Sequence, residues 1–232
     1  MKHLITVFLF FISSSISAQD INQLDANGKR HGIWKKTFEG TNQLRYQGEF
    51  SHGKEIGLFK FYKLLKKKSV LTATKQFNES DNIADVRFLS SRGKVISQGR
   101  MNGKLYVGEW TYYHNNSNVI MTRETYDNEG RLQGKRIVYY DNGLLAEEVN
   151  YEEGSKYGVS KWYSLKGVVL KQFVYKNNEL HGIAKYYNGK GEILVEGSYK
   201  RGKKTGIWKY YKEGELVEEK DLTYRPKYKK KQ

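Results

Sequence analysis

The stretch Tyr199–Gly214, YKRGKKTGIWKYYKEG, contains a turn, a glycine, the run Ile-Trp-Lys-Tyr-Tyr and a second turn. Variants of this stretch make up most of the chain. A repeat with a period of ~20–50 residues decides the architecture, so it is considered before any single residue. A residue type that returns in every copy is expected to serve the fold, because each unit buries its apolar face only against a neighbouring unit.

Eight units emerge when the copies are aligned on the glycine that precedes the aromatic run. The third unit has Ala84 in place of this glycine, and the fifth carries one extra residue before its two tyrosines. The repeat glycines of the other seven units and the four tryptophans of the chain are expected to be structural residues of the repeat. They are Gly32, Gly57, Gly108, Gly134, Gly158, Gly182 and Gly206, together with Trp34, Trp110, Trp162 and Trp208.

A second segment follows each aromatic run in a constant register. It ends on an apolar or aromatic residue, with a second apolar residue six positions earlier and a polar residue three positions earlier. Glycine and asparagine separate the segments, as at Asn142-Gly143 and at Gly202. Short segments of this kind, bounded by such residues, predict strands joined by hairpin turns. The final residues of the segments are Phe50, Phe77, Met101, Tyr126, Tyr151, Tyr175, Tyr199 and Leu222.

We therefore predict an all-β fold, an elongated single-layer antiparallel β-meander of about eight two-stranded hairpin repeats. The connections are too short for parallel crossovers. With strands ~4.8 Å apart, the ribbon would be on the order of 80 Å long. Residues 63–82 fit the repeat least well. The runs Lys66-Lys67-Lys68 and Asn78 to Asn82 indicate an enlarged loop and a degraded unit.

The first residues of the chain have the order of a secretion signal: a short basic start, an apolar run from Leu4 to Ile12, and a small polar segment that ends at Ala18. Cleavage is expected after Ala18, and the protein is expected in the periplasm, at the outer surface or in the medium. A membrane anchor is the alternative, but the apolar run is short for a span of ~20 residues. No transmembrane span is expected after cleavage. The expected divisions are a signal peptide at 1–18, a short lead at 19–24, a repeat domain at 25–222 and a basic tail at 223–232.

The repeat resembles the MORN repeat, and more closely the bacterial variant found in YwqK-like proteins, which are often labelled antitoxins. The pattern Tyr-Lys-x-Gly-Lys-x-x-Gly-x-Trp-x-Tyr-Tyr-x-x-Gly carries this resemblance and is matched best by Tyr199–Gly214. The resemblance covers roughly residues 25–222. It implies an extended single-layer sheet of hairpins that scaffolds or binds without catalysis. It also implies phospholipids or proteins as partners, or the neutralisation of a toxin.

Residues suited to catalysis or metal binding do not form a recognisable motif. The chain has no cysteine, which excludes thiol catalysis, cysteine-based metal sites and disulfides. His31 and His181 both precede a repeat glycine and are interpreted as turn residues. Adjacent glutamates such as Glu147 and Glu148 point to opposite faces of a strand, so they are not expected to act together. We expect no catalytic residue, no metal and no cofactor, and hence a protein that is not an enzyme.

A basic residue recurs three positions after the repeat glycine. Six of the eight units carry Lys or Arg there, and we call these six residues the basic ladder. Strand alternation predicts that Lys209 shares a face with Ile207 and Tyr211, while Trp208 and Tyr210 take the other face. The basic ladder consists of Lys35, Lys60, Arg87, Lys161, Lys185 and Lys209.

Two interpretations of the basic ladder remain open. The net charge is +16, so the ladder either binds an acidic partner or only keeps a thin sheet soluble, with lysine stems covering tyrosine rings. A protein partner or an anionic surface, either phospholipid or acidic polysaccharide, is the expected ligand, and nucleic acid ranks low. The leading hypothesis is an exported, non-enzymatic binding or scaffold module. The alternative is an antitoxin or immunity-type protein. Neither the partner nor the oligomeric state follows from the sequence.

Overall fold

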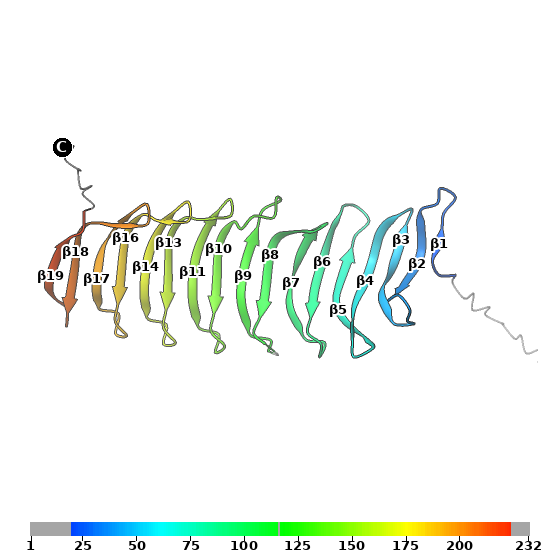
Figure 1. Ribbon diagram of the computed structural model, residues 1–232, viewed down its shortest axis with the longest axis horizontal. Helices are drawn as coiled ribbons and strands as arrows, with labels where there is room; N and C mark the ends of the chain where they lie inside the picture. Colours follow the sequence, from blue (N-terminus) through cyan, green and yellow to red (C-terminus); the bar gives the residue numbers. More distant parts are fainter. Residues whose placement is uncertain (1–19, 116, 224–232) are drawn as a thin grey trace, which may run out of the picture.

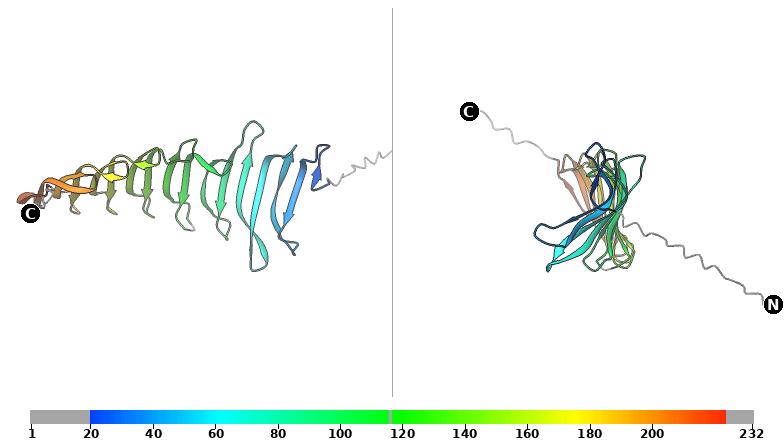
Figure 2. Two further views of the ribbon diagram at one scale, coloured as in Figure 1. Left: turned by 45° about the horizontal axis from the view of Figure 1, so that its top comes forward. Right: turned by 90° about the vertical axis from the view of Figure 1, so that its right-hand side faces the viewer.

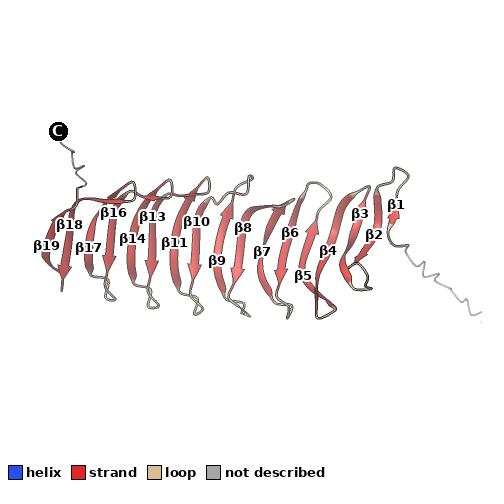
Figure 3. Cartoon of the chain, viewed as in Figure 1, coloured by secondary structure: helices blue, strands red, loops and turns tan. Residues whose placement is uncertain are grey.

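The protein forms one open antiparallel sheet. The computed structural model describes residues 20–115 and 117–223, and these residues contain 19 strands and no helix (Figures 1 and 3). Strands neighbouring in the sequence pair in the sheet, so that a single layer runs from β1 at one end to β19 at the other. The predicted single-layer antiparallel meander is confirmed.

The eight predicted units correspond to eight hairpins. Three further strands of two residues each complete the sheet: β1 (Gln23–Leu24), β12 (Ser155–Lys156) and β15 (Glu179–Leu180). The hairpins are β2 (Arg30–Thr37) with β3 (Leu44–Ser51), β4 (Lys54–Leu65) with β5 (Lys68–Phe77), β6 (Ile83–Leu89) with β7 (Val95–Asn102), β8 (Leu105–Tyr113) with β9 (Ile120–Tyr126), β10 (Gly134–Tyr139) with β11 (Leu145–Glu152), β13 (Gly158–Tyr163) with β14 (Val169–Lys176), β16 (Gly182–Tyr187) with β17 (Ile193–Lys200), and β18 (Lys203–Lys212) with β19 (Glu215–Asp221).

The ribbon is long in one direction and narrow when seen end-on (Figure 2). Its two ends differ. Beside β2, the side-chain oxygen of Asn22 accepts a hydrogen bond from the backbone N–H of Lys35 at 2.8 Å, and Trp34 Nε1 donates to the carbonyl oxygen of Gln23 at 3.0 Å. Residues of the predicted lead therefore cover part of this edge. At the other end, all seven residues of β19 are exposed.

The repeat glycines have a local structural role. All seven adopt left-handed backbone angles, with φ between 64° and 112°, where a side chain would be strained. Between units, the strand register shifts at Gly57, Gly108 and Gly206. Ala84 instead pairs with Phe77 in an unbroken register. The glycine thus produces a bulge at the start of a unit, and the unit with alanine lacks it.

A second set of glycines makes room for the aromatic core. A Cβ atom built on Gly99 would lie 2.5 Å from a ring carbon of Trp110, and Gly197 would likewise overlap Trp208. Both tryptophans are fully buried. Where the ring position holds a small residue, a neighbour can be larger, as at the buried Ser160, which pairs with Phe173. A single-layer sheet therefore builds a core by matching one large and one small residue on adjacent strands.

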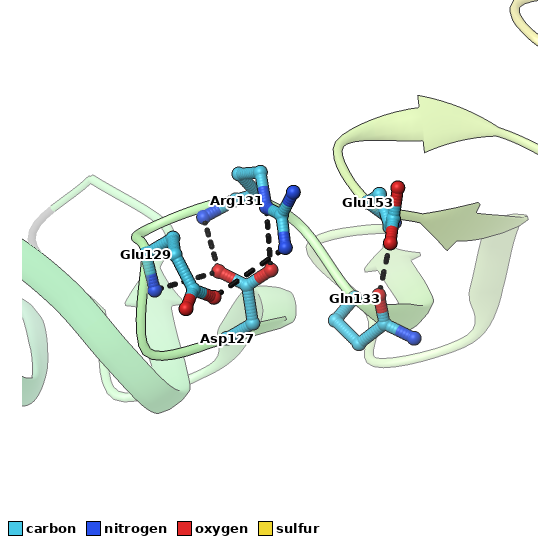
Figure 4. Close-up of polar contacts among 5 residues, drawn as sticks. All are labelled: Asp127, Glu129, Arg131, Gln133 and Glu153. Atoms are coloured by element: carbon cyan, nitrogen blue, oxygen red, sulfur yellow. Dashed lines mark hydrogen bonds and ion pairs between the residues drawn. The ribbon is translucent and has the colours of Figure 1, made fainter.

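The turns between units are held by side chains (Figure 4). The carboxylate of Asp127 accepts hydrogen bonds from the backbone N–H groups of Glu129 and Arg131, and Arg131 Nε donates to the same carboxylate at 2.7 Å. The side-chain oxygen of Gln133 then accepts the backbone N–H of Glu153 at 3.0 Å. The bond from Glu153 to Gln133 thereby joins two successive inter-unit turns outside the strand ladder.

The predicted enlarged loop at Lys66–Lys68 is wrong in its extent. Strands β4 and β5 continue to Leu65 and Lys68, so that only Lys66 and Lys67 form the loop. This β4–β5 hairpin extends beyond its neighbours (Figure 2, left). Gln43 contacts the hairpin near its tip, because its side-chain oxygen accepts the backbone N–H of Ser69 at 2.8 Å. The loop is shorter than predicted because Leu65 and Lys68 pair across the hairpin, although the run of lysines from Lys66 to Lys68 suggested a longer loop.

Some predictions fall on residues that are not described. The signal peptide at 1–18 and residues 224–232 of the basic tail lie outside the described residues. Among residues 20–115 and 117–223, no helix has the length and apolar character needed to cross a membrane.

Candidate binding face

One row of side chains crosses the whole sheet. Successive backbone pairs connect it, and residues paired directly across antiparallel strands point to the same face. The row joins the basic ladder to the polar residues that lie three positions before the end of each second segment. In order from β2 to β19 it contains Lys35, Gln47, Lys60, Thr74, Arg87, Gln98, Thr111, Arg123, Ile137, Glu148, Lys161, Gln172, Lys185, Glu196, Lys209 and Glu219.

The structure places all six residues of the basic ladder in this row. The predicted faces are also observed. Ile207 is 55% exposed, whereas Trp208 is buried on the other face. We call the side that carries the row the ladder face and the side that carries Trp208 the aromatic face. The sequence did not show that each basic residue has polar residues of adjacent strands as its direct neighbours.

In the C-terminal half of the row, three glutamates lie among the three lysines, and the neutral Gln172 lies between Lys161 and Lys185. Lys185 Nζ lies 3.5 Å from Glu196 Oε2, and Lys209 Nζ lies 3.6 Å from Glu219 Oε1. Glu148 pairs with Lys161 in the register and forms an ion pair of 3.1 Å with Lys135. This half of the row therefore carries no net charge.

Tyrosine hydroxyls support the acidic residues of the row. Tyr163 Oη donates to Glu148 Oε2 at 2.7 Å, and Tyr211 Oη donates to Glu196 Oε1 at 2.8 Å. The bond from Tyr163, together with Lys135, holds the pKa of Glu148 below its ordinary value. Burial and the Glu148 carboxylate raise the pKa of Tyr163 to about 12. Both groups thus keep their usual charges at neutral pH, the carboxylate ionised and the phenol neutral.

In the N-terminal half of the row, the residues paired with the cations along the row are all neutral. Lys35, Lys60, Arg87 and Arg123 alternate with glutamine and threonine. Within the part of the chain that the structure describes, none of the four forms a salt bridge. Arg123 was absent from the predicted ladder because it lies on the second strand of its unit. Arg123 lies three positions before Tyr126, where every unit has a polar residue, and this regularity in the sequence could have revealed it.

The adjoining row of the ladder face partly offsets these cations. It contains Glu49, Asp85, Arg100 and Glu109, which leaves a net charge of +2 on this half of the face. Arg87 and Arg100 border an open hollow of about 380 Å³ together with two of these carboxylates. In the C-terminal half, the same adjoining row contains the exposed Val159, Ile183 and Ile207, together with the oppositely charged Lys135 and Asp221. The two halves of the ladder face therefore differ in chemistry.

The aromatic face contains an ionic cluster at the centre of the sheet. Arg136 occupies the position of the core tryptophans, and it bonds Glu124 at 2.9 Å and Glu147 at 3.0 Å. Burial opposes the charge of Arg136, yet the two carboxylates raise its pKa above the ordinary value. Tyr126 Oη donates to the second oxygen of Glu124 at 2.6 Å. The polar groups of this cluster are occupied by one another.

The other chemistry-bearing residues are dispersed. Glu147 and Glu148 point to opposite faces, as predicted, since Glu147 bonds Arg136 and Glu148 bonds Tyr163. The interpretation of His31 as a turn residue is wrong, because His31 lies in β2 and pairs with Gln23. Its ring lies against that of His52 in the turn between β3 and β4, with ring centroids 4.8 Å apart. Between residues 20 and 223, excluding residue 116, no three His, Asp or Glu side chains are placed to hold a metal ion.

Comparison of the chain with models of known protein families finds no match, and a comparison with curated proteins finds none. The likeness to MORN repeats therefore rests on the residues of the repeat itself.

Proposed function

We propose that the chain is an exported, non-enzymatic MORN-type binding module that docks on an anionic envelope surface through the N-terminal half of its ladder face. The observation that supports this most is the run of Lys35, Lys60, Arg87 and Arg123 along one row with no acidic member. One strand lies between successive cations of this run, except between Arg87 and Arg123, which have two strands between them. The first three cations therefore recur at intervals on the order of 10 Å. Such a row suits a surface with repeated negative charges, because each cation meets a separate group.

The β4–β5 hairpin adds to this surface. No acidic residue lies between Glu55 and Glu79, a segment that includes Lys63, Lys66, Lys67 and Lys68. Near the tip, Leu64 is 38% and Leu65 is 42% exposed. Adjacent strand residues point to opposite sides, so the tip has apolar groups on both sides within a ring of lysines. This combination suits shallow insertion among headgroups with lysines near the anionic charges.

A protein partner is the second candidate, and a different observation favours it. The exposed Val159, Ile183 and Ile207 lie in successive units beside a row that carries no net charge and in which Lys185 and Lys209 form ion pairs with glutamates. An apolar strip flanked by satisfied polar groups is typical of the centre of a protein interface. A scaffold would then hold a protein at its C-terminal half while the N-terminal half contacts the envelope. A toxin would use the same strip, and rescue of growth on co-expression would identify that role.

The test compares two triple variants with equal charge change. Lys60→Gln/Arg87→Gln/Arg123→Gln alters the N-terminal half, and Lys161→Gln/Lys185→Gln/Lys209→Gln alters the C-terminal half. Binding is measured to vesicles of phosphatidylglycerol mixed with phosphatidylcholine, and to phosphatidylcholine alone. Each cation near an anionic surface contributes about 1 kcal/mol, so the first variant should lose binding by about 100-fold and the second should retain most of it. Equal losses in the two variants, or equal binding to neutral vesicles, would refute the proposal.

A further inference from the structure

An open hollow of about 480 Å³ lies on the aromatic face, opposite the ladder face, between the first two units. Aromatic rings form its floor. Phe50 and Phe59 are buried and pack edge to face with ring centroids 5.2 Å apart, and Phe61 stacks on Phe59 at 6.1 Å. Tyr46 pairs with Phe61 across β3 and β4, and these two half-buried rings supply the accessible part of the floor above the buried Phe50 and Phe59. The hollow is thus floored by ring faces and edges rather than by aliphatic side chains.

Exposed charged residues surround this floor. Arg30, Lys36 and Arg45 supply three cations, and Glu55 supplies one carboxylate. The guanidinium of Arg30 lies 5.0 Å from the Trp34 ring. Within the described residues, none of the four charges belongs to a salt bridge. Donors and an acceptor are therefore available at the rim of one aromatic hollow.

The repeat shows that the fold does not require these cations. Arg45 lies at the β-bulge in the second strand of its unit, a bulge that recurs in every unit. Lys36 lies four residues after its repeat glycine. No other unit has a charged residue at either position. The residues equivalent to Arg45 are Thr72, Ile96, Met121, Ala146, Leu170, Leu194 and Val217, and those equivalent to Lys36 are Phe61, Phe88, Tyr112, Val138, Trp162, Tyr186 and Tyr210.

Glu55 is also distinctive for its position. Two residues before the repeat glycine, the unit of Gly108 has Tyr106, whose ring stacks on Trp110 at 3.9 Å. The unit of Gly206 has Lys204 at this position, with its ammonium 4.1 Å from the Trp208 ring centroid. The negative face of an aromatic ring attracts cations and repels a carboxylate. A carboxylate at Glu55 therefore gains nothing from packing on the ring of its own unit, and Glu55 remains an exposed residue at the rim of the hollow.

We propose that this hollow binds an acidic sugar, a pyranose ring that carries a carboxylate. The C–H groups of a pyranose carry slight positive charge and pack on the negative faces of aromatic rings. Arg30, Lys36 and Arg45 match the sugar carboxylate. Glu55 would repel a simple anion, but it accepts hydrogen bonds from sugar hydroxyls. A polyhydroxylated anion satisfies both the cations and the carboxylate of the rim. The site lies on the opposite face from the proposed docking surface and does not depend on it.

The test uses substitutions that the repeat already contains. Lys36→Tyr/Arg45→Leu converts the rim to the residues found at the equivalent Tyr186 and Leu194, so the fold should be retained. The control Lys166→Gln/Lys190→Gln removes the same charge from exposed turns elsewhere. Calorimetric titration of the whole chain with a galacturonate trimer should show saturable binding. We expect at least a tenfold loss in Lys36→Tyr/Arg45→Leu and no change in the control.

Two further ligands distinguish this site from general attraction of anions. A neutral galactose trimer and inorganic phosphate should each bind at least tenfold more weakly than the galacturonate trimer. Tighter binding of phosphate, equal losses in the two double variants, or no binding of galacturonate by the unaltered chain would each overturn the proposal. Loss of vesicle binding in the ladder variants, with galacturonate binding intact, would show that the two faces act separately.

Discussion

Tyr163 Oη donates a 2.7 Å hydrogen bond to Glu148 Oε2 across neighbouring units, and the two residues lie 15 positions apart. The same separation joins Tyr211 to Glu196 at 2.8 Å and Tyr113 to Gln98 at 2.8 Å. A tyrosine of one unit thus positions the polar row residue of the preceding unit. The polar row is therefore tied to the sheet by a repeated contact as well as by the backbone.

Replacement of this tyrosine should alter how the protein responds to pH. In Tyr163→Phe the pKa of Glu148 should rise toward its ordinary value, because the carboxylate loses the hydrogen bond that most lowers its pKa. A lowered carboxyl pKa gives stability that is present above the ordinary value and is lost as pH falls through the folded-state pKa. Acid unfolding should therefore begin at a higher pH in the variant. NMR titration of the Glu148 carboxyl carbon and unfolding at several pH values measure both effects.

The alkaline side gives an independent check of the same pair. The pKa of Tyr163 is raised to about 12, so the stability due to its neutral form is present below about pH 10 and is lost as pH rises through 12. Tyr163→Phe should lack this loss. Tyr187→Phe alters the same position of the next unit, where the row residue is Gln172. An identical acid shift in Tyr187→Phe would contradict the explanation.

Glycine opposite a buried ring should be far more sensitive than glycine in a turn. Gly197→Ala places a methyl group against the Trp208 ring, and overpacking of this kind costs about 1–3 kcal/mol. Gly189→Ala meets no atom within 4 Å and has no left-handed backbone angle, so its effect should be small. Urea unfolding of the two variants measures the difference. Similar stabilities would show that Trp208 moves aside at little cost.

The cluster around Arg136 should depend on all three charges together. Arg136→Leu leaves Glu124 and Glu147 without their cation, although both are largely covered, with side chains 12% and 22% exposed. Loss of one charged partner should cost about 1–3 kcal/mol. The triple variant Arg136→Leu/Glu124→Gln/Glu147→Gln removes every charge and should recover much of this loss. A triple variant less stable than Arg136→Leu alone would show that the carboxylates stabilise the sheet by another route.

The tip of the β4–β5 hairpin should gain stability at the expense of its charge. Lys66 and Lys67 adopt left-handed angles, with φ of 47° and 63°, in a two-residue turn where Asn-Gly is preferred. Lys66→Asn/Lys67→Gly should stabilise the fold by about 0.5–2 kcal/mol. Lys66→Gln/Lys67→Gln removes the same charge without relieving the backbone and should leave stability unchanged. Both pairs should weaken binding to anionic vesicles; unaltered binding would exclude the tip from the docking surface.

The repeat pattern was sufficient to predict the all-β meander and the face assignment around Trp208. Both follow from local rules, since side chains alternate along a strand and short glycine-containing turns force neighbouring strands to pair. The same rules placed Lys209 and Ile207 on one exposed face. They did not predict that the strands continue through residues 63–70, because the lysine-rich composition there is typical of a loop while the strand pairing extends to Leu65 and Lys68.

Only the tertiary structure shows which residues lie beside each basic residue on the adjacent strands. The sequence repeats a cation in six units, but the paired strands place glutamate beside Lys185 and Lys209 and only glutamine or threonine beside Lys35 and Lys60. A positive residue counts as a binding group when its neighbours leave it uncompensated. Those neighbours lie about 10–15 positions away, and their pairing depends on the bulge at each unit. The sequence by itself therefore determined the architecture and the faces of this protein, whereas strand pairing determined which half of the ladder face is charged.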